Sequence, residues 1–506
     1  MSFINSIYIS LMRKRLKAID SYARNAEDIQ HRQWANLVRR AASTEYGRSY
    51  RFADIRTEQQ FREQVPIIGY PELQPYIERL MKGEDYLLWP EKIKWFSKSS
   101  GTTGTKSKYI PVSKEALAYC HYKGGKDMYA LYMRNHPDSG VFKGKTVSMG
   151  GSLRAWPDNT QVHCGDVSAI LTQYLPFWAE SRRIPKRDIA MMDNWEQKLP
   201  MMAEATLKQD VRSLMGVPSW ILLYLEKILE LSGKQSLHEI WPRLELLIHG
   251  GVSFTPYRKQ YETLLGPSAH YIETYNASEG FFGMQDLENE DMLLMLDYGI
   301  YYEFLPVEEW DKEKPQAIGI DKLEIGKNYA LVISTNAGLW RYLIGDTLIF
   351  SSLHPLRFRI SGRTRHFINT FGEELMVNNA DKALSAACAE TGAEISDYTA
   401  APVFLDASNQ ARHQWLIEFK KTPDNLQTFT ASLDAHLKDL NSDYEAKRSN
   451  NILLKQPEVV PLPTGTFYAW LKQKGKLGGQ HKVPRLSNSR EYADEILKIK
   501  SMEDSL

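Results

Sequence analysis

The chain has 506 residues, and its 63 basic side chains nearly balance its 62 acidic ones, giving a formal net charge of +1. A nucleic-acid partner and an anionic membrane surface are therefore not expected, because both require a basic excess or a basic patch. The length predicts at least two domains, since a single hydrophobic core rarely serves so long a chain.

The N-terminal stretch, residues 1–23, carries its apolar residues first and its basic residues, from Arg13 to Lys17, afterwards. A secretory signal has the reverse order, so we expect an amphipathic helix packed on the body of the protein. No apolar run is long enough to predict a membrane span. The cysteines lie far apart without a CxxC pair, which favours a reducing compartment and a cytoplasmic location.

The first 90 residues predict mainly helices, and from residue 93 onward strand-like and helix-like segments alternate. Such alternation is typical of an α/β domain whose strands are buried in a sheet. A β-hairpin is predicted over the apolar stretch 291–308. The predicted helices are 28–42, 114–135, 198–215 and 220–232, and the predicted strands are 93–96, 146–149, 244–248, 270–274 and 330–334.

Beyond residue 362 the pattern restarts as a compact α+β module of the length that a small domain needs. Helices are predicted over 381–390 and 426–440, with a strand over 414–419 between them. The sequence therefore predicts a large N-terminal α/β domain with mixed β-sheets, residues 1–361, and a small C-terminal α+β domain, residues 362–506.

The segment from Ser99 to Lys108 reads SSGTTGTKSK, an unbroken run of hydroxyl and glycine residues with two lysines. Glycines let a backbone approach phosphate oxygens, hydroxyls donate hydrogen bonds to them, and a lysine supplies positive charge. The spacing fits neither the Walker loop nor the dinucleotide fingerprint. On composition alone the segment is either a phosphate-binding loop or a solvated surface loop.

Two further motifs carry a carboxylate beside a predicted strand. Residues 275–280 read YNASEG, in which Glu279 is suited to hold magnesium against phosphates. Residues 342–346 read YLIGD, in which Asp346 is suited to accept hydrogen bonds from both hydroxyls of a ribose. Each motif taken alone is equally consistent with a simple polar turn.

The three motifs, in this order and with STNAGLWRY just before the last, resemble those of the auxin-responsive acyl acid amido synthetases, the Gretchen Hagen family. That family belongs to the adenylate-forming superfamily, and the resemblance covers nearly the whole chain. It implies a two-step ligase: a carboxylic acid is activated with ATP and Mg2+ to acyl-AMP, and the acyl group then passes to an amine, such as that of an amino acid.

The resemblance also implies roles for particular residues. The ATP phosphates would be held by Ser99, Ser100, Thr102 and Thr103 with Lys106, the α-phosphate by Ser278, the magnesium ion by Glu279, and the ribose by Asp346. Tyr275 would stack on the adenine, and Gly250 and Gly251, in the segment IHGGV, would line the adenine and acyl pockets.

In the C-terminal domain, residues 360–365 (ISGRTR) resemble the superfamily's hinge, with Arg365 as the hinge residue. Residues 478–485 (GGQHKVPR) resemble the family's lysine motif, so Lys482 would stabilise charge during adenylation, with Lys476 as a rival. The sequence departs from the plant pattern at 372–375 (GEEL), where a lysine is replaced, and at Leu343, which stands in place of an arginine. Both departures concern the amine side of the site.

The acyl pocket is expected among the aromatic-rich segments 149–156, 169–178, 217–224 and 249–254, with Arg154, Trp220 and His249 as candidate substrate contacts. An acyl-CoA or aryl-CoA ligase shares the first half-reaction and remains an alternative, as does a carboxylate-binding protein without turnover. An α/β-hydrolase is disfavoured because no GxSxG nucleophile elbow occurs. The sequence indicates no oligomeric state.

Overall fold

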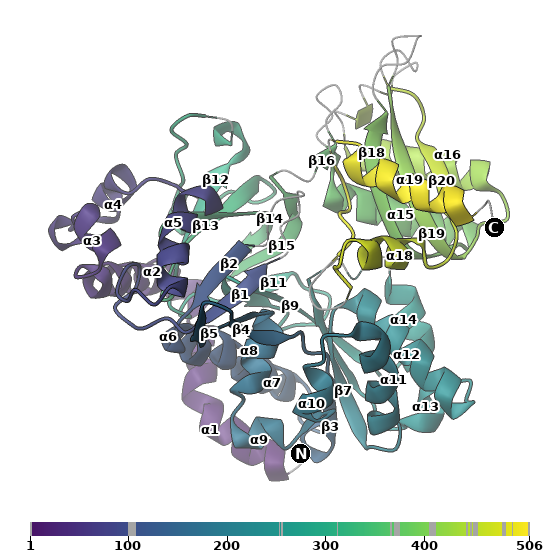
Figure 1. Cartoon of the computed structure of the whole chain (residues 1–506), viewed down its shortest axis with the longest axis horizontal. Coiled ribbons are helices and arrows are strands. Elements are labelled where there is room, and N and C mark those ends of the chain that lie inside the picture. Colours follow the sequence, from purple (N-terminus) through teal and green to yellow (C-terminus); the bar gives the residue numbers. More distant parts are fainter. Residues whose placement is uncertain are drawn as a thin grey trace. The chain divides into compact units, whose positions relative to one another are not determined.

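The computed structural model describes residues 3–99, 108–251, 254, 257–310, 312–364, 367–368, 375–403, 411–441, 444–445, 448, 454–477, 482–487 and 489–503. The chain forms two compact units (Figure 1). The first unit comprises residues 1–217, 223–251 and 267–359, and the second comprises 218–222, 252–266 and 360–506.

A mixed sheet of 11 described strands forms the core of the first unit. Its β3, β6, β7, β8 and β9 run parallel, and its remaining pairs with printed register are antiparallel. In spatial order the strands are β12 (Ile300–Pro306), β13 (Asn328–Thr335), β14 (Tyr342–Leu353), β15 (Leu356–Arg363), β11 (Met292–Leu294), β10 (Gly280–Met284), β9 (His270–Ala277), β8 (Leu246–Gly250), β7 (Val211–Gly216), β3 (Lys145–Ser148) and β6 (Arg183–Ile184).

A second, four-stranded sheet has the order β2 (Lys108–Val112), β1 (Trp95–Ser99), β5 (Asn159–Gly165) and β4 (Leu153–Trp156). The helices up to residue 265 are α1 (Phe3–Asp20), α2 (Tyr22–Ala41), α3 (Glu45–Ser49), α4 (Glu58–Gln64), α5 (Tyr70–Met81), α6 (Lys114–Ala116), α7 (Tyr122–Asn135), α8 (Val167–Gln173), α9 (Phe177–Glu180), α10 (Arg187–Ala190), α11 (Trp195–Thr206), α12 (Pro218–Ser232), α13 (Leu237–Ile240) and α14 (Arg258–Leu265). None of the described helices is both long enough and apolar enough to cross a bilayer.

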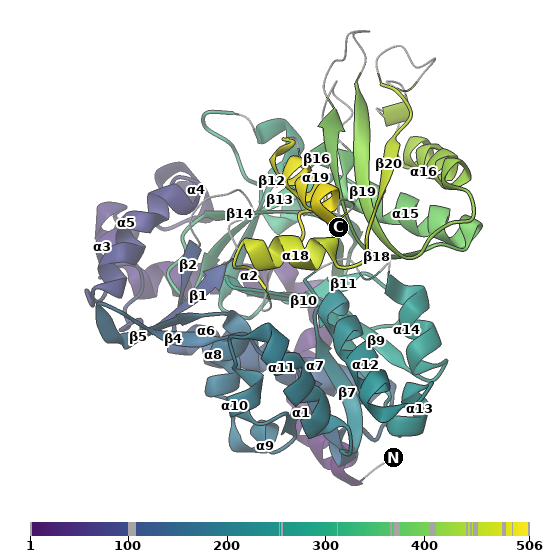
Figure 2. The ribbon, with the colours of Figure 1, turned by 45° about the vertical axis from the view of Figure 1, so that its right-hand side comes forward.

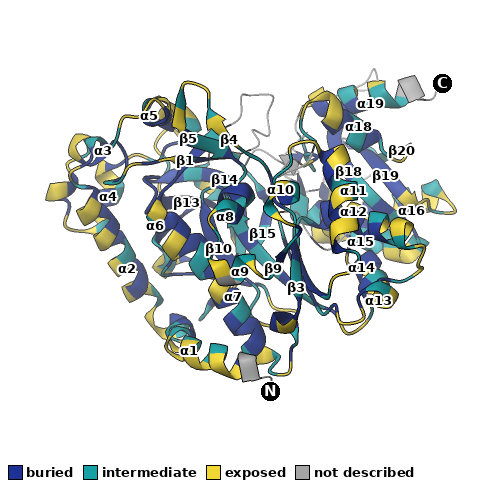
Figure 3. Cartoon of the chain, turned by 60° about the horizontal axis from the view of Figure 1, so that its bottom comes forward, coloured by how far each residue is buried: buried dark blue, intermediate teal, exposed yellow. Residues whose placement is uncertain are grey.

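The N-terminal helix packs on the body of its unit, as the sequence predicts. Arg15 of α1 donates through Nε to Asp127 of α7 over 2.8 Å and also pairs with Asp297. The next helix, α2, buries one face, which includes Trp34 and Leu37, and leaves the other exposed (Figure 3). These contacts fix both helices on the outside of the first unit.

Two predicted elements are wrong. The helix predicted over 198–215 ends at Thr206, and residues 211–216 instead form β7 between β3 and β8, because the apolar run after Asp210 is buried in the parallel sheet. The hairpin predicted over 291–308 does not form. Its strands β11 and β12 lie apart in the sheet, and Gln30 of α2 holds the intervening segment by donating to the carbonyls of Leu296 and Ile300.

The second unit is built on a three-stranded sheet, with α15 and α16 on one face and α19 on the other (Figure 2). Its core gathers Leu384, Trp415, Phe429 and Leu433, each fully buried. The elements are β16 (Phe367–Ile368), β17 (Leu375–Met376), α15 (Val377–Thr391), β18 (Glu394–Val403), β19 (Arg412–Lys421), α16 (Leu426–Leu440), β20 (Glu458–Leu462), α18 (Thr466–Gln473) and α19 (Glu491–Glu503).

Candidate active site

The hydroxyl- and glycine-rich segment connects the antiparallel strands β1 and β2, which pair Ser99 with Lys108. On its other side β1 pairs in parallel with β5, so both ends of the connection start from a fixed sheet. The side chain of Ser99 and the residues Ser100, Thr102, Thr103 and Lys106 lie outside the described residues.

The YNASEG motif occupies the end of β9 and a two-residue turn into β10. Ala277 pairs with Gly280 across the turn, which leaves Ser278 and Glu279 at its tip. The side chain of Ser278 is buried and that of Glu279 is half-buried. A tight hairpin therefore presents a hydroxyl and a carboxylate side by side at a fixed point of the large sheet.

A hydrogen bond joins the first motif's strand to this turn. The Ser97 hydroxyl on β1 donates to the Ser278 hydroxyl over 2.9 Å, and both residues are buried. Ser97 was not among the residues predicted from the sequence. It lies two residues before the first motif on β1, and this nearness to the motif is the signal that would have identified it.

The third motif owes its geometry to an irregularity in β14. Thr347 pairs with Ala330 and Leu343 with Val332, so three residues of β14 face one residue of β13. Gly345, at φ 94°, provides the backbone conformation that this bulge needs and that other residues rarely adopt. The bulge directs Asp346 to Tyr275, whose hydroxyl donates to Oδ2 of Asp346 over 2.5 Å.

The ring of Tyr275 is held in place by two aromatic neighbours. Its ring is buried and contacts Phe282, with ring centroids 4.8 Å apart, and Phe358 at 6.2 Å. Because packing fixes the ring of Tyr275, its hydroxyl has a fixed position, and the hydrogen bond restricts the carboxylate of Asp346. Tyr275 thus positions Asp346, a role that the sequence did not indicate, whereas its stacking on adenine stays a prediction.

His121 contacts the hairpin formed by β9 and β10 through Asn276. Its Nδ1 lies 2.8 Å from Oδ1 of Asn276, and because a carbonyl oxygen only accepts, Nδ1 carries the proton. Burial lowers the pKa of His121 to about 4, so the ring is neutral near pH 7. His121 ends a π-helical turn, residues 117–121, which leads into α7. No pattern in the sequence indicated this contact.

The predicted glycine pair stands at the end of β8, beside β9. A Cβ atom on Gly250 would lie 2.2 Å from the carbonyl oxygen of Thr274, so only glycine fits there. Gly251 has φ 84°. His249 is buried, and its carbonyl accepts a 3.1 Å hydrogen bond from the Thr274 hydroxyl. This packing brings the segment IHGGV next to the strand that carries Tyr275.

The remaining predicted residues lie on other elements of the chain. Arg154 on β4 is 72% exposed and pairs with Asp193 through an Nε–Oδ2 contact of 2.8 Å. Trp220 is buried in α12, in the part of that helix that belongs to the second unit. Lys482 is exposed and Lys476 half-buried, both in the second unit. The hinge residue Arg365 lies outside the described residues.

The STNAGLWRY motif forms the turn between β13 and β14 and anchors it. Arg341, at φ 42°, is buried against the fully buried Glu303, with 2.9 Å between Nη2 and Oε1. Its Nη1 donates to the carbonyls of Arg62 and Val65, 2.6 Å each. Trp340 donates to the carbonyl of Leu88 over 3.0 Å. The motif therefore secures the strand that carries Asp346.

The fold is that of adenylate-forming enzymes. A 2-hydroxyisobutyryl-CoA ligase solved in its postadenylation state with 2-HIB-AMP superimposes with a TM-score of 0.59 at 13% identity, over 97% of this chain and 93% of that one. A GH3.15 acyl acid amido synthetase solved with 2,4-DB superimposes with a TM-score of 0.78 at 19% identity, over 96% and 95%.

The chain belongs to the GH3 family. Residues 15–269 match the GH3 family N-terminal domain, 293–363 its central domain and 378–491 its C-terminal domain. Similar proteins include the probable indole-3-acetic acid-amido synthetase GH3.1 of Arabidopsis thaliana, 22% identical over 94% of this chain and 91% of that protein. Another is the indole-3-acetic acid-amido synthetase GH3.8 of Oryza sativa subsp. indica, 25% identical over 76% and 75%. The resemblance predicted from the motifs is confirmed.

Proposed function

We propose that this chain is an ATP-dependent acyl acid amido synthetase, which activates a carboxylic acid as acyl-AMP and transfers the acyl group to an amine such as that of an amino acid. Membership of the GH3 family supports this activity, because relatives in the family are named as amido synthetases. We place the reaction in the cytoplasm, where ATP and amino acids are available and dispersed thiols stay reduced.

The observation that carries the proposal is that β1, which leads into the first motif, contacts the hairpin of the second motif, and that β9 of this hairpin contacts the strand of the third. The Ser97–Ser278 bond joins segments 181 residues apart, and the Tyr275–Asp346 bond joins segments 71 residues apart. A nucleotide needs its phosphates, magnesium ion and ribose bound at once, and each motif supplies the chemistry for one of these. A set of unrelated polar turns would have no reason to converge.

In the first step the substrate carboxylate attacks the α-phosphorus of ATP in line and displaces pyrophosphate. The enzyme's contribution is to position the reactants and neutralise charge. Asp346, oriented by Tyr275, accepts hydrogen bonds from the ribose hydroxyls and fixes the nucleoside. The glycine-rich connection before β2, with Lys106, binds the phosphates. Ser278 at the buried turn contacts the α-phosphate.

Glu279 fits a magnesium ion, because it is a half-buried carboxylate at a rigid turn beside the α-phosphate contact. When bound there, the ion would supply positive charge to the phosphates, and Glu279 would hold it.

In the second step an amine attacks the acyl carbonyl and AMP departs. A rotation of the C-terminal domain, residues 362–506, about Arg365 would let one site serve both steps, with Lys482 acting in adenylation. Arg154, Trp220 and His249 stay the candidate contacts for the acid. The alternative acceptor is coenzyme A. An amine acceptor would make the chain an amido synthetase, whereas coenzyme A would make it an acyl-CoA ligase.

The proposal is tested by ATP–pyrophosphate exchange with purified protein and Mg2+, using a panel of indolic, other aromatic and fatty acids. Exchange that depends on one acid class establishes adenylation and identifies the acid. That acid is then incubated with ATP and either a mixture of amino acids or coenzyme A, and the product is identified by mass spectrometry. An amide supports the proposal, and a thioester with no amide contradicts it.

An Asp346→Ala variant is the control for the exchange assay, because loss of exchange in this variant shows that the signal comes from the site described. Absence of both exchange and ATP binding in the unaltered protein would overturn the proposed function.

A further inference from the structure

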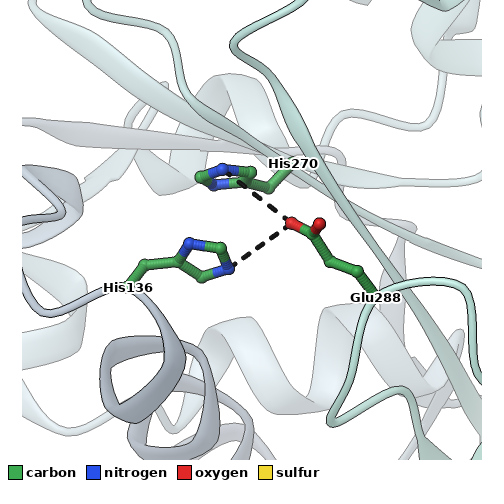
Figure 4. Close-up of side chains that lie close together, drawn as sticks. All are labelled: His136, His270 and Glu288. Atoms are coloured by element: carbon green, nitrogen blue, oxygen red, sulfur yellow. Dashed lines mark ion pairs between the residues drawn. The ribbon is translucent and has the colours of Figure 1, made fainter.

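A cluster of two histidines and one glutamate lies at the opposite end of β9 from the YNASEG hairpin. His136 follows the last turn of α7, His270 begins β9, and Glu288 stands in the connection between β10 and β11 (Figure 4). One ligand atom from each residue lies within 4.8 Å of the other two. Three separate segments of the first unit thus direct metal-binding atoms to one point.

The distances leave room for an ion at that point. Oε1 of Glu288 is 3.6 Å from Nε2 of His136 and 3.9 Å from Nε2 of His270, both longer than a hydrogen bond. Two ligand atoms on a tetrahedral zinc ion are roughly 3.3 Å apart, from metal–ligand lengths of about 2.0–2.2 Å. Glu288 is 57% exposed, so its carboxylate has room to move by the few tenths of an ångström that separate these two distances from the zinc spacing.

The two imidazoles are held in a shared orientation by Tyr132. The rings of His136 and His270 stack with centroids 3.9 Å apart, and the buried Tyr132 ring contacts both. The Tyr132 hydroxyl lies 2.8 Å from Nδ1 of His270. When that hydroxyl accepts the Nδ1 proton, the lone pair of His270 on Nε2 faces the cluster, an arrangement typical of metal-ligating histidines.

The glutamate's segment is also tied to the histidine's segment. Asn135, next to His136, donates to the carbonyl of Asp286, and Arg357 fixes the Asp286 carboxylate with a 2.6 Å contact. These contacts hold the segment of Glu288 beside His136.

We propose that His136, His270 and Glu288 form a binding site for one divalent transition-metal ion of the zinc class, which clamps the end of α7, the start of β9 and the β10–β11 connection together. Two imidazoles and a carboxylate suit zinc, whereas Mg2+ and Ca2+ prefer all-oxygen ligand sets. The ion would stabilise the unit and takes no part in adenylation, so this site stands independently of the proposed function.

The test uses untagged, full-length protein stripped of metal with a chelator. Equilibrium dialysis against Zn2+ with elemental analysis is expected to give one bound ion per chain. In the absence of nucleotide, thermal unfolding should shift upward with Zn2+, because an ion that binds only the folded state stabilises it, and should stay unchanged with Mg2+. Co2+ should report tetrahedral coordination through its visible absorption bands.

The ligand variants His136→Ala and His270→Ala should each lose the bound ion and the thermal shift. Glu288→Gln, on an exposed side chain, provides a variant with little risk to folding and should weaken Zn2+ binding. Tyr132→Phe should weaken it about 10–100-fold, as loss of a ligand's hydrogen-bond partner does.

The matched control is His31→Ala, because His31 and Glu58 form a pair at 3.0 Å with one histidine instead of two. This variant should bind Zn2+ like the unaltered protein. Failure of the unaltered protein to bind Zn2+ would overturn the proposal. Equal stoichiometry and affinity in the unaltered protein and in Glu288→Gln and His270→Ala would overturn it as well, since the ion would then bind elsewhere.

Discussion

The hydroxyl of Tyr275 donates a 2.5 Å hydrogen bond to Oδ2 of Asp346, which ties the hairpin of one motif to the bulged strand of another. The bond restricts the carboxylate that we propose binds the ribose. Loss of the carboxylate should therefore act on nucleotide binding more than on the fold.

We predict that Asp346→Ala weakens ATP binding by about 1.5–3 kcal/mol, the range for hydrogen bonds to a charged group. Isothermal titration calorimetry in the presence of Mg2+ measures the change. Asp54→Ala removes an exposed carboxylate that pairs only locally with Arg51 and should leave ATP affinity unaltered. Unchanged affinity in Asp346→Ala would remove the ribose assignment.

Lys482 and Lys476 make a matched pair, because both lysines belong to the second unit and either could act in adenylation. We predict that Lys482→Ala lowers the rate of acid-dependent ATP–pyrophosphate exchange by about 10²–10³, the usual loss for one group that stabilises transition-state charge. Lys476→Ala should reduce it little. The reverse order of effects would transfer the role to Lys476.

His121 should make the protein less stable in mild acid. The pKa of His121 is lowered to about 4 in the folded state, against 6.5 for an ordinary histidine. Between these values the unfolded chain binds a proton that the native chain does not. Stability is therefore expected to fall as the pH drops, by roughly 2–3 kcal/mol between pH 7 and 4.5.

Urea unfolding at a series of pH values measures this dependence. His121→Gln should flatten the curve in that window, whereas the same change at the exposed His238 should not. A curve of the same slope in His121→Gln and the unaltered protein would contradict the assignment.

The buried ion pair of Arg341 and Glu303 is the strongest candidate for a severe loss of stability. Arg341→Ala would leave the fully buried Glu303 without its principal partner, which costs about 3–5 kcal/mol. Arg134→Ala removes a partly exposed pair with Asp20 and should cost at most about 1 kcal/mol. Equilibrium urea unfolding compares the two, and similar losses would show that the buried pair has no special weight.

The sequence by itself determined the family and most of the elements. The helix predicted over 426–440 forms with the same bounds, because its apolar spacing and its Asn425 cap are local signals. Such signals depend only on residues that are close together in the sequence.

Tertiary structure alone decided which distant residues meet. A buried apolar run fits either a helix or a strand, so the sequence could not decide the structure of residues 211–216. They form a strand because they pair with β3 on one side and β8 on the other. The contacts Ser97–Ser278, His121–Asn276 and His136–His270 each join segments more than a hundred residues apart. The order of the strands in the sheet determines which residues meet in these contacts. Hydrophobic periodicity along the sequence does not reveal that order.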